Sequence, residues 1–140
     1  MNLTLEKASI IVDQTLAKAR ELALRPMCVA VLDEGGHLKA LKREDGAGIL
    51  RPQIAIGKAW GALGMGESSR AIGQRLQERV AFLGALSDMS DGKVVPVAGG
   101  VLILQDHDVV GAVGVSGGTS DEDEAIALVG IESAGLGHEV

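Results

Sequence analysis

The sequence predicts an α+β fold in which an antiparallel sheet of two hairpins is flanked by helices. Two observations carry this prediction. Pairs of short apolar runs, each pair joined by a polar or glycine-containing turn, are typical of β-hairpins. Segments with apolar residues at helical spacing precede, separate and follow these pairs. The length of 140 residues fits one domain, so we expect residues 1–140 to form a single unit.

The first helix and the first hairpin are expected at the amino-terminal end. Apolar residues recur every three or four positions over 4–24, with Thr4 as the N-cap and Pro26 as the residue that stops the helix. The runs 27–32 and 37–43 lie on either side of a turn that contains two glycines. These two runs therefore predict a hairpin.

Two further helices are expected in the middle of the chain. Pro52 suits the first turn of a helix that runs to about residue 63. Ser68 or Ser69 can cap a second, short helix that continues to about Val80. Residues 84–93 are polar and rich in turn formers, so we expect a loop there.

The clearest hairpin of the sequence comes next, and a last helix follows it. Residues 101–104 and 109–115 are apolar runs separated by four polar residues. A pair of glycines ends the second run. Ser120 and Asp123 have the spacing of a capping box, which predicts a helix over 121–134.

Composition and charge exclude several classes of partner. Hydrophobic residues make up 46% of the chain, and Trp60 and Phe82 are its only aromatic residues. With 20 glycines, the core is expected to use small side chains and closely approaching backbones. The formal net charge of −6 argues against nucleic acid, whose phosphates require clustered Lys and Arg.

The expected location of the protein is cytoplasmic. The amino terminus lacks the layout of a signal peptide, and no apolar run approaches the roughly 20 residues of a membrane span. We therefore expect no membrane partner. The single cysteine, Cys28, lies in an apolar run and is expected to pack as a small hydrophobic residue. No Cys/His spacing of a zinc site is present, and no metal is predicted.

Three segments of the chain resemble the GlcG/HbpS family, which is related to the C-terminal domain of PduO-type corrinoid adenosyltransferases. Residues 29–38 with their continuation 43–47 form the first segment, 54–59 the second, and 111–118 with 123–127 the third. The combination of Asp-x-Gly-Gly-His-Leu with Gly-Val-Ser-Gly and a trailing Asp-Glu carries most of the resemblance. It implies a profilin-like sheet flanked by helices, a homo-oligomer, and haem binding in some members, with haem degradation or sensing proposed.

The sequence departs from the family pattern in two places. Leu102 stands where members usually carry Pro in Gly-Gly-Val-Pro, and Trp60-Gly61 stands within the motif Lys-Ala-x-Thr-Ala. We expect both segments to shape a pocket, so the ligand of this chain is left open.

His37 is the candidate ligand for haem iron, because histidine is a common axial ligand. Its other interpretation is a surface residue of the first hairpin. The expected cofactor site consists of five residues: His37, Arg43, Gly99, Gly100 and Ser116. His107 is better explained as a solvated hairpin tip than as a metal ligand, and His138 is expected to be uninvolved.

Lys58 lies on an otherwise apolar helix and is the candidate for acid–base chemistry, together with Asp45 and Asp123. The alternative is an ion pair of Lys58 with Asp45 or Asp123 that fastens the helix to the sheet. Ser116 occupies the centre of a Gly-x-Ser-x-Gly string, but the parallel sheet that a hydrolase requires is not predicted.

Three functions stay open at this point. The first is a homo-oligomeric module that holds haem or another small-molecule ligand in a pocket at a subunit interface. The second is an enzyme of small-molecule metabolism that uses Lys58, Asp45 and Asp123. The third is an accessory subunit without a ligand. Whether the protein is an enzyme is left undecided.

Overall fold

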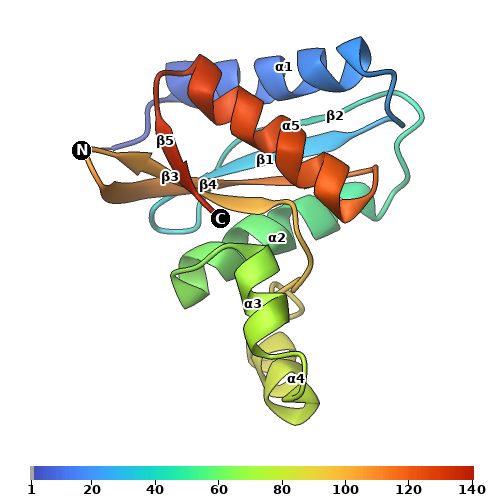
Figure 1. The fold of residues 1–140 in the computed structure, drawn as a ribbon, viewed down its shortest axis with the longest axis vertical. Helices are drawn as coiled ribbons and strands as arrows, with labels where there is room; N and C mark the ends of the chain where they lie inside the picture. Colours follow the sequence, from blue (N-terminus) through green and yellow to red (C-terminus); the bar gives the residue numbers. More distant parts are fainter. Residues whose placement is uncertain (1) are drawn as a thin grey trace.

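The computed structural model describes residues 2–140 and has the predicted order of helices and hairpins, with two additional elements (Figure 1). In chain order, the elements are α1 (Leu5–Glu21), β1 (Cys28–Asp33), β2 (Leu38–Arg43), α2 (Arg51–Met65), α3 (Ser69–Arg75), α4 (Val80–Met89), β3 (Gly100–Gln105), β4 (Asp108–Ser116), α5 (Ser120–Ser133) and β5 (Gly137–Glu139).

The five strands form one antiparallel sheet in the order β2-β1-β4-β3-β5. Both predicted hairpins are confirmed, as β1–β2 and β3–β4. The two hairpins join through β1 and β4, which run side by side from the pair Cys28–Ser116 to the pair Asp33–Gly111. The third family segment therefore lies next to the first in the centre of the sheet.

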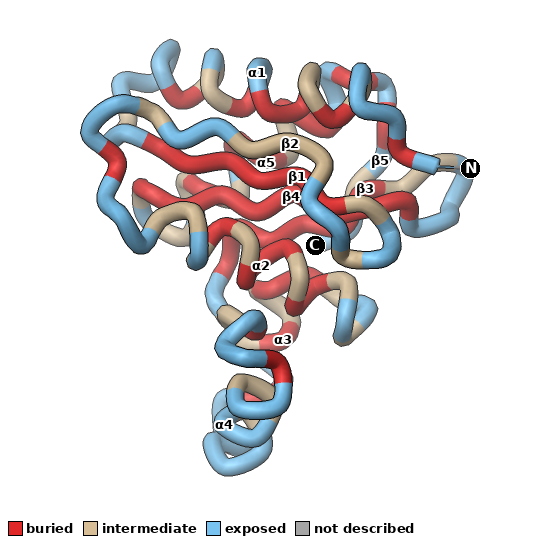
Figure 2. The backbone as a smooth tube through the Cα atoms, turned by 180° about the vertical axis from the view of Figure 1, so that it is seen from behind, coloured by how far each residue is buried: buried red, intermediate tan, exposed pale blue. Residues whose placement is uncertain are grey.

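Helices cover both faces of the sheet. Figure 1 shows α1 and α5 on one face and α2 on the other, and Figure 2 shows the central strands buried between these layers. The main apolar core lies between the sheet and the α1–α5 layer, and it includes Ile11, Val29, Val113 and Ile131. This arrangement confirms the predicted α+β fold.

Glycines let α2 lie directly on the sheet, as the composition indicated. A Cβ atom on Gly114 of β4 would overlap the carbonyl of Ala55, and one on Gly100 of β3 would overlap the carbonyl of Lys58. On the opposite side of α2, a Cβ atom on Gly61 would lie 3.2 Å from the Cα atom of Val94. The glycine face of α2 is therefore an internal contact with the segment before β3.

The caps of the two long helices gave one confirmed and one wrong prediction. Thr4 caps α1, its hydroxyl accepting from the backbone N–H of Lys7. The capping box of α5 is formed by Thr119 and Glu122, one residue earlier than the predicted pair of Ser120 and Asp123. Asp123 instead binds Lys58 through one carboxylate oxygen and accepts from the backbone N–H of Gly118 through the other.

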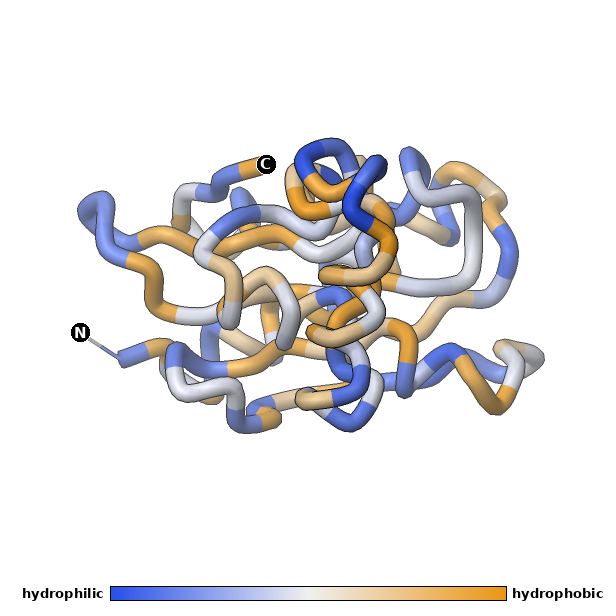
Figure 3. Tube along the Cα trace, turned by 90° about the horizontal axis from the view of Figure 1, so that it is seen from below, coloured by the Kyte–Doolittle hydropathy of each residue, from blue (hydrophilic) through white to orange (hydrophobic). Residues whose placement is uncertain are grey.

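The expected loop over residues 84–93 is wrong in its first half, because α4 extends to Met89. The single short helix expected up to Val80 is instead divided, with α3 ending at Arg75 and α4 beginning at Val80. Figure 1 shows α4 projecting beyond α2 and α3, away from the sheet. None of its residues is buried, although its sequence is largely apolar. Figure 3 views the molecule from this projecting end and colours it by hydropathy.

The C-terminal segment forms an unpredicted short strand, β5, which pairs with β3. His138 pairs with Ile103 in this strand, and its Nε2 atom lies 2.9 Å from a carboxylate oxygen of Glu132. No helix within residues 2–140 has the length and apolar character needed to cross a membrane.

Candidate functional site

A buried ion pair joins α2 to the beginning of α5. The Nζ atom of Lys58 lies 3.0 Å from Oδ2 of Asp123, and the two side chains are only 3% and 2% exposed. Lys58 also donates to the carbonyl of Val115 at 2.9 Å, and Asp123 accepts from the backbone N–H of Gly118 at 2.9 Å. Each charged group therefore has a second partner at the end of β4, as a buried ion pair requires.

Three of the predicted cofactor residues surround this ion pair. A Cβ atom on Gly99, whose φ is +128°, would lie 2.8 Å from Nζ of Lys58. The backbone N–H of the neighbouring Gly100 donates to Oγ of Ser69 at 2.7 Å. Ser116 is buried beside Val115, and its Oγ accepts from the Arg51 guanidinium at 3.1 Å. Gly99 thus leaves room for the Lys58 side chain, and Gly100 leaves room for the backbone of α2.

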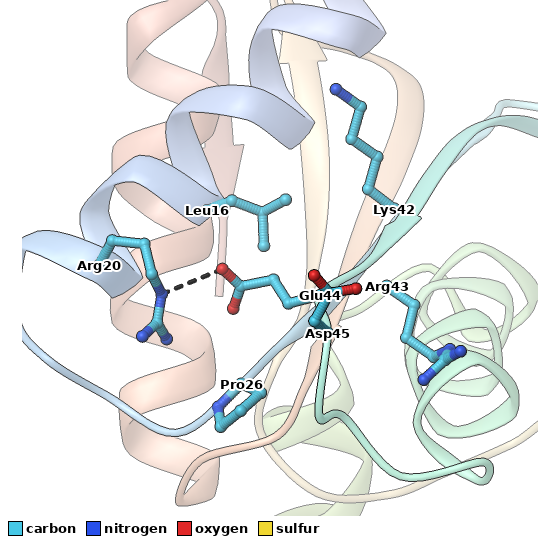
Figure 4. A pocket seen from close by; sticks show the side chains of 7 residues that line it. All are labelled: Leu16, Arg20, Pro26, Lys42, Arg43, Glu44 and Asp45. Carbon is cyan, nitrogen blue, oxygen red and sulfur yellow. Dashed lines mark ion pairs between the residues drawn. The ribbon is translucent and has the colours of Figure 1, made fainter.

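Asp45 and Arg43 lie elsewhere, at the end of β2. Both residues are exposed, and they line a pocket of about 410 Å³ between α1 and β2. Figure 4 shows this pocket, in which Arg20 of α1 pairs with Glu44 at 3.0 Å. Arg43 donates to the carbonyl of Ala47 at 2.6 Å. The structure therefore brings Lys58 and Asp123 together in the interior, whereas Asp45 lies in the pocket between α1 and β2.

The thiol of Cys28 is buried opposite Arg43 in the sheet. Burial raises the pKa of this thiol to about 11, although the Arg43 guanidinium has an opposing, lowering effect. The thiol is therefore protonated near neutral pH. A protonated, buried thiol is a poor nucleophile and a poor ligand for iron.

His37 lies in the turn of the first hairpin, where its side chain is 81% exposed. Its Nδ1 atom lies 3.2 Å from Oδ1 of Asp33, and its backbone N–H donates to the same oxygen at 3.0 Å. Burial by itself would raise the pKa of the Asp33 carboxyl, but backbone N–H donors of His37 and Gly35, with the nearby His37 charge, lower it below its ordinary value. Lys39 and Leu3 line the adjoining pocket of about 300 Å³.

Two smaller pockets meet at Trp60, which the sequence singled out only as a departure from the family pattern. One, of about 150 Å³, lies between Trp60 and the turn of the first hairpin. The other, of about 230 Å³, lies between Trp60, Leu86 and Met89, and its walls are mainly apolar. The sequence did not predict this second pocket because no helix was expected over residues 80–89, although the apolar run there is a usable signal.

The histidines and acids of the chain do not gather into a metal site. Within residues 2–140, no group of three His, Cys, Asp or Glu side chains lies close enough to hold a metal ion.

The comparisons with known proteins agree with the architecture described above. The family model described as "Haem degrading protein HbpS-like" matches residues 3–132. An uncharacterized 15.0 kDa protein of Citrobacter freundii is 29% identical over 130 residues, which are 93% of this chain and 90% of that protein. The corrinoid adenosyltransferase PduO of Salmonella typhimurium is 29% identical over 120 residues, or 86% of this chain.

This chain spans only 35% of the length of the Salmonella adenosyltransferase, so that enzyme's activity belongs to a longer protein. Among solved structures, the crystal structure of a PduOC–haem complex has a TM-score of 0.89 and 26% sequence identity. The similarity covers 100% of both chains.

Proposed function

The chain belongs to the HbpS-like family of haem-degrading proteins, and from this we propose that it binds haem, or a closely related cofactor, as a homo-oligomer. One observation carries the proposal. The whole chain has the same fold as a protein crystallised with haem, with a TM-score of 0.89 over its full length. A fold alone does not determine function, so the proposal also needs residues suited to the cofactor.

His37 fits the role of an axial ligand. Ligating histidines usually donate one ring N–H to a carboxylate, which orients the ring and leaves the other nitrogen for the metal. Asp33 lies 3.2 Å from Nδ1 of His37, so Nε2 is the nitrogen that would bind iron. Lys39 lines the same pocket and offers a cation for a haem propionate.

The pocket beside His37 measures about 300 Å³ and leaves the His37 side chain 81% exposed. Pockets that bury a ligand of drug size or larger measure roughly 300–1,000 Å³. The pocket beside His37 lies at the lower limit of this range, which is small for a macrocycle as large as haem. We therefore propose that a second copy of the chain completes the haem pocket at a subunit interface.

Haem titration of the purified protein tests this proposal. We expect a saturable shift of the Soret band at a fixed ratio of haem to protomer. Trp60 is the only tryptophan and the chain has no tyrosine, so its fluorescence reports from a single position. Quenching of this fluorescence should saturate at the same ratio as the Soret shift.

A matched pair of variants identifies the ligand. His37→Asn should weaken haem binding at least tenfold and change the Soret position, because the axial nitrogen is lost. His107→Asn is the control, since His107 lies at an exposed turn with a φ of 72° that asparagine also adopts. Equal weakening by both variants, or by neither, would remove His37 as the ligand.

The alternative of an acid–base enzyme stays a prediction. The full pairing of Lys58 with Asp123 and Val115 supports the interpretation of this lysine as a structural cation. Asp45 lies in another pocket, so no arrangement of these three residues favours a shared catalytic role.

A further inference from the structure

The larger of the two pockets at Trp60 is separate from the His37 pocket and shares no residue with it. It measures about 230 Å³ and lies between α2 and α4, the helix that projects away from the sheet (Figure 1). Trp60, Gly64 and Met65 come from α2, and Leu86 and Met89 come from α4. This Trp60 pocket has no role in the haem binding proposed above.

The walls of the Trp60 pocket suit a flat aromatic ring. Gly64 leaves the six-membered ring of Trp60 uncovered, since even a Cβ atom at this position would lie 3.7 Å from Cζ3 of the indole. A ligand ring can therefore pack against the indole in the offset or edge-to-face arrangement that aromatic pairs prefer. Met65 and Met89 line the same space, and thioether sulfur contacts aromatic rings favourably. These groups favour a ring over a flexible aliphatic chain.

The wall of the pocket offers no charged group to a ligand. Among the described residues that line it, none is Asp, Glu, Lys, Arg or His. Ser90 contributes a hydroxyl, which donates to the carbonyl of Ser87 at 3.3 Å and accepts from the backbone N–H of Lys93 at 3.1 Å. The part of a ligand inside the pocket is therefore apolar, because a polar group there would lose its hydrogen bonds with water.

Lys93 supplies a positive charge at the edge of the pocket. It lies between Ser90 and Val94, which both line the pocket, and its Nζ atom lies over the Trp60 ring, 5.7 Å from the centroid. Lys93 is exposed and makes no ion pair within residues 2–140. Its ammonium group therefore attracts the anionic group of a ligand whose apolar part lies against Trp60.

We propose that the Trp60 pocket binds a small carboxylate with a single aromatic ring, whose ring packs against Trp60 and whose carboxylate pairs with Lys93. An apolar cavity of about 150 Å³ is enough to hold benzene. The Trp60 pocket, at about 230 Å³, therefore admits one ring with a short side chain. This ligand goes beyond haem and does not depend on it. Failure of haem binding would leave the aromatic acid site standing, and the reverse also holds.

Titration with phenylacetate tests the proposal. Trp60 is the only tryptophan, so a ligand ring beside it should change the fluorescence in a saturable way. We expect a Kd below about 1 mM, which is within reach of a ligand of roughly ten non-hydrogen atoms. Hexanoate, which has the charge but no ring, should compete with phenylacetate with a Kd at least about threefold higher. No saturable change with phenylacetate, or equal binding of hexanoate, would overturn the proposal.

Lys93→Met tests the pairing of the carboxylate. The substitution removes the charge at an exposed position, so the fold should be unaffected. Phenylacetate should bind about three- to fivefold more weakly at low ionic strength, as expected when an exposed ion pair is lost. Neutral phenylacetamide should bind the wild type and the variant equally. Lys42→Met is the matched control, because Lys42 is also exposed but lies on β2, and it should bind phenylacetate like the wild type. Equal weakening by both variants, or the same loss for the acid and the amide, would overturn the proposal.

Gly64→Leu fills the pocket. A Cβ atom at Gly64 makes ordinary contact with Trp60, and leucine favours a helix more than glycine does, so the variant should fold. It should weaken the binding of both phenylacetate and phenylacetamide at least tenfold. Gly84→Leu is the control and should bind like the wild type, since Gly84 lies on α4 outside the pocket and has no neighbour within 4 Å.

Hydrogen exchange locates the bound ligand. Phenylacetate should slow the exchange of α4 amides in the wild type, because a ligand between α2 and α4 stabilises the closed form of α4. It should not slow this exchange in Gly64→Leu. Unchanged binding by Gly64→Leu, or binding to the wild type without protection of α4, would overturn the proposal.

Discussion

At the residue scale, the Lys58–Asp123 pair is where the fold depends most on single side chains. Both groups are almost completely removed from water and hold each other at 3.0 Å. A buried ion pair adds little to the free energy of unfolding, because the attraction between the charges is offset by the cost of removing them from water. Removing one partner is costly, because the other charge then stays buried without a counter-charge. The pair joins α2, the end of β4 and the start of α5. We therefore expect that replacing both residues destabilises the protein less than replacing one of them.

We expect Lys58→Met to lower the free energy of unfolding by about 3–5 kcal/mol, as for other broken buried ion pairs. Adding Asp123→Asn should recover more than half of this loss, because the charge disappears while the amide oxygen still accepts from the Gly118 N–H. Denaturant unfolding of the single and double variants measures both values. Lys42→Met is the control, since its pair with Asp13 is exposed and should be worth less than about 1 kcal/mol. Additive losses in the double variant would contradict this account.

The sequence predicted this pair as one of two interpretations of Lys58, but it did not separate Asp123 from Asp45. A charged residue in an apolar helix must find a partner, and that requirement is readable from the sequence. Which acid provides it depends on how β4 places Val115 and Gly118 over α2, and this is a tertiary contact. The same limit applies to His37, whose neighbour Asp33 is local while the remaining walls of its pocket come from Leu3 and Val110.

At the element scale, both α5 and α4 differ from what their sequences predicted. Thr119 and Ser120 are both good N-caps, and each has an acid three residues later, so sequence alone offered two starts for α5. The structure uses Thr119, and Asp123, the partner required by the other start, binds Lys58 and the backbone N–H of Gly118 instead. For α4, the glycine and the missing side-chain cap obscured a helix that packs only on the small cluster around Ile72.

Thr119→Ala should lower the free energy of unfolding by about 1 kcal/mol, because the backbone N–H of Glu122 loses its acceptor. Ser120→Ala should change it by less than about 0.5 kcal/mol, since this residue lies in the first turn of α5 and caps nothing. Thermal or denaturant unfolding of the two variants compares them directly. If Ser120→Ala lowered the free energy of unfolding more than Thr119→Ala, the N-cap of α5 would be Ser120, as the sequence predicted.

At the scale of the whole molecule, two parts have very different amounts of packing. The sheet with α1, α2 and α5 contains nearly all of the fully buried side chains. In the arm formed by α3 and α4, Ser69 and Arg70 of α3 also bind Gly100 and Glu124. In contrast, α4 rests on one small cluster around Ile72, Leu76 and Val94 and contributes no buried residue to it. Segments with few buried apolar contacts open locally at a much lower free energy than the core. We therefore expect the arm to open locally at a lower free energy than the cooperative unfolding of the sheet with α1, α2 and α5.

Native-state hydrogen exchange measures this difference. At low protein concentration, amides of α4 should exchange with an opening free energy close to zero, while amides of β4 should exchange only through global unfolding. Equal protection of α4 and β4 in the dilute protein would mean that the arm is held by contacts within its own chain.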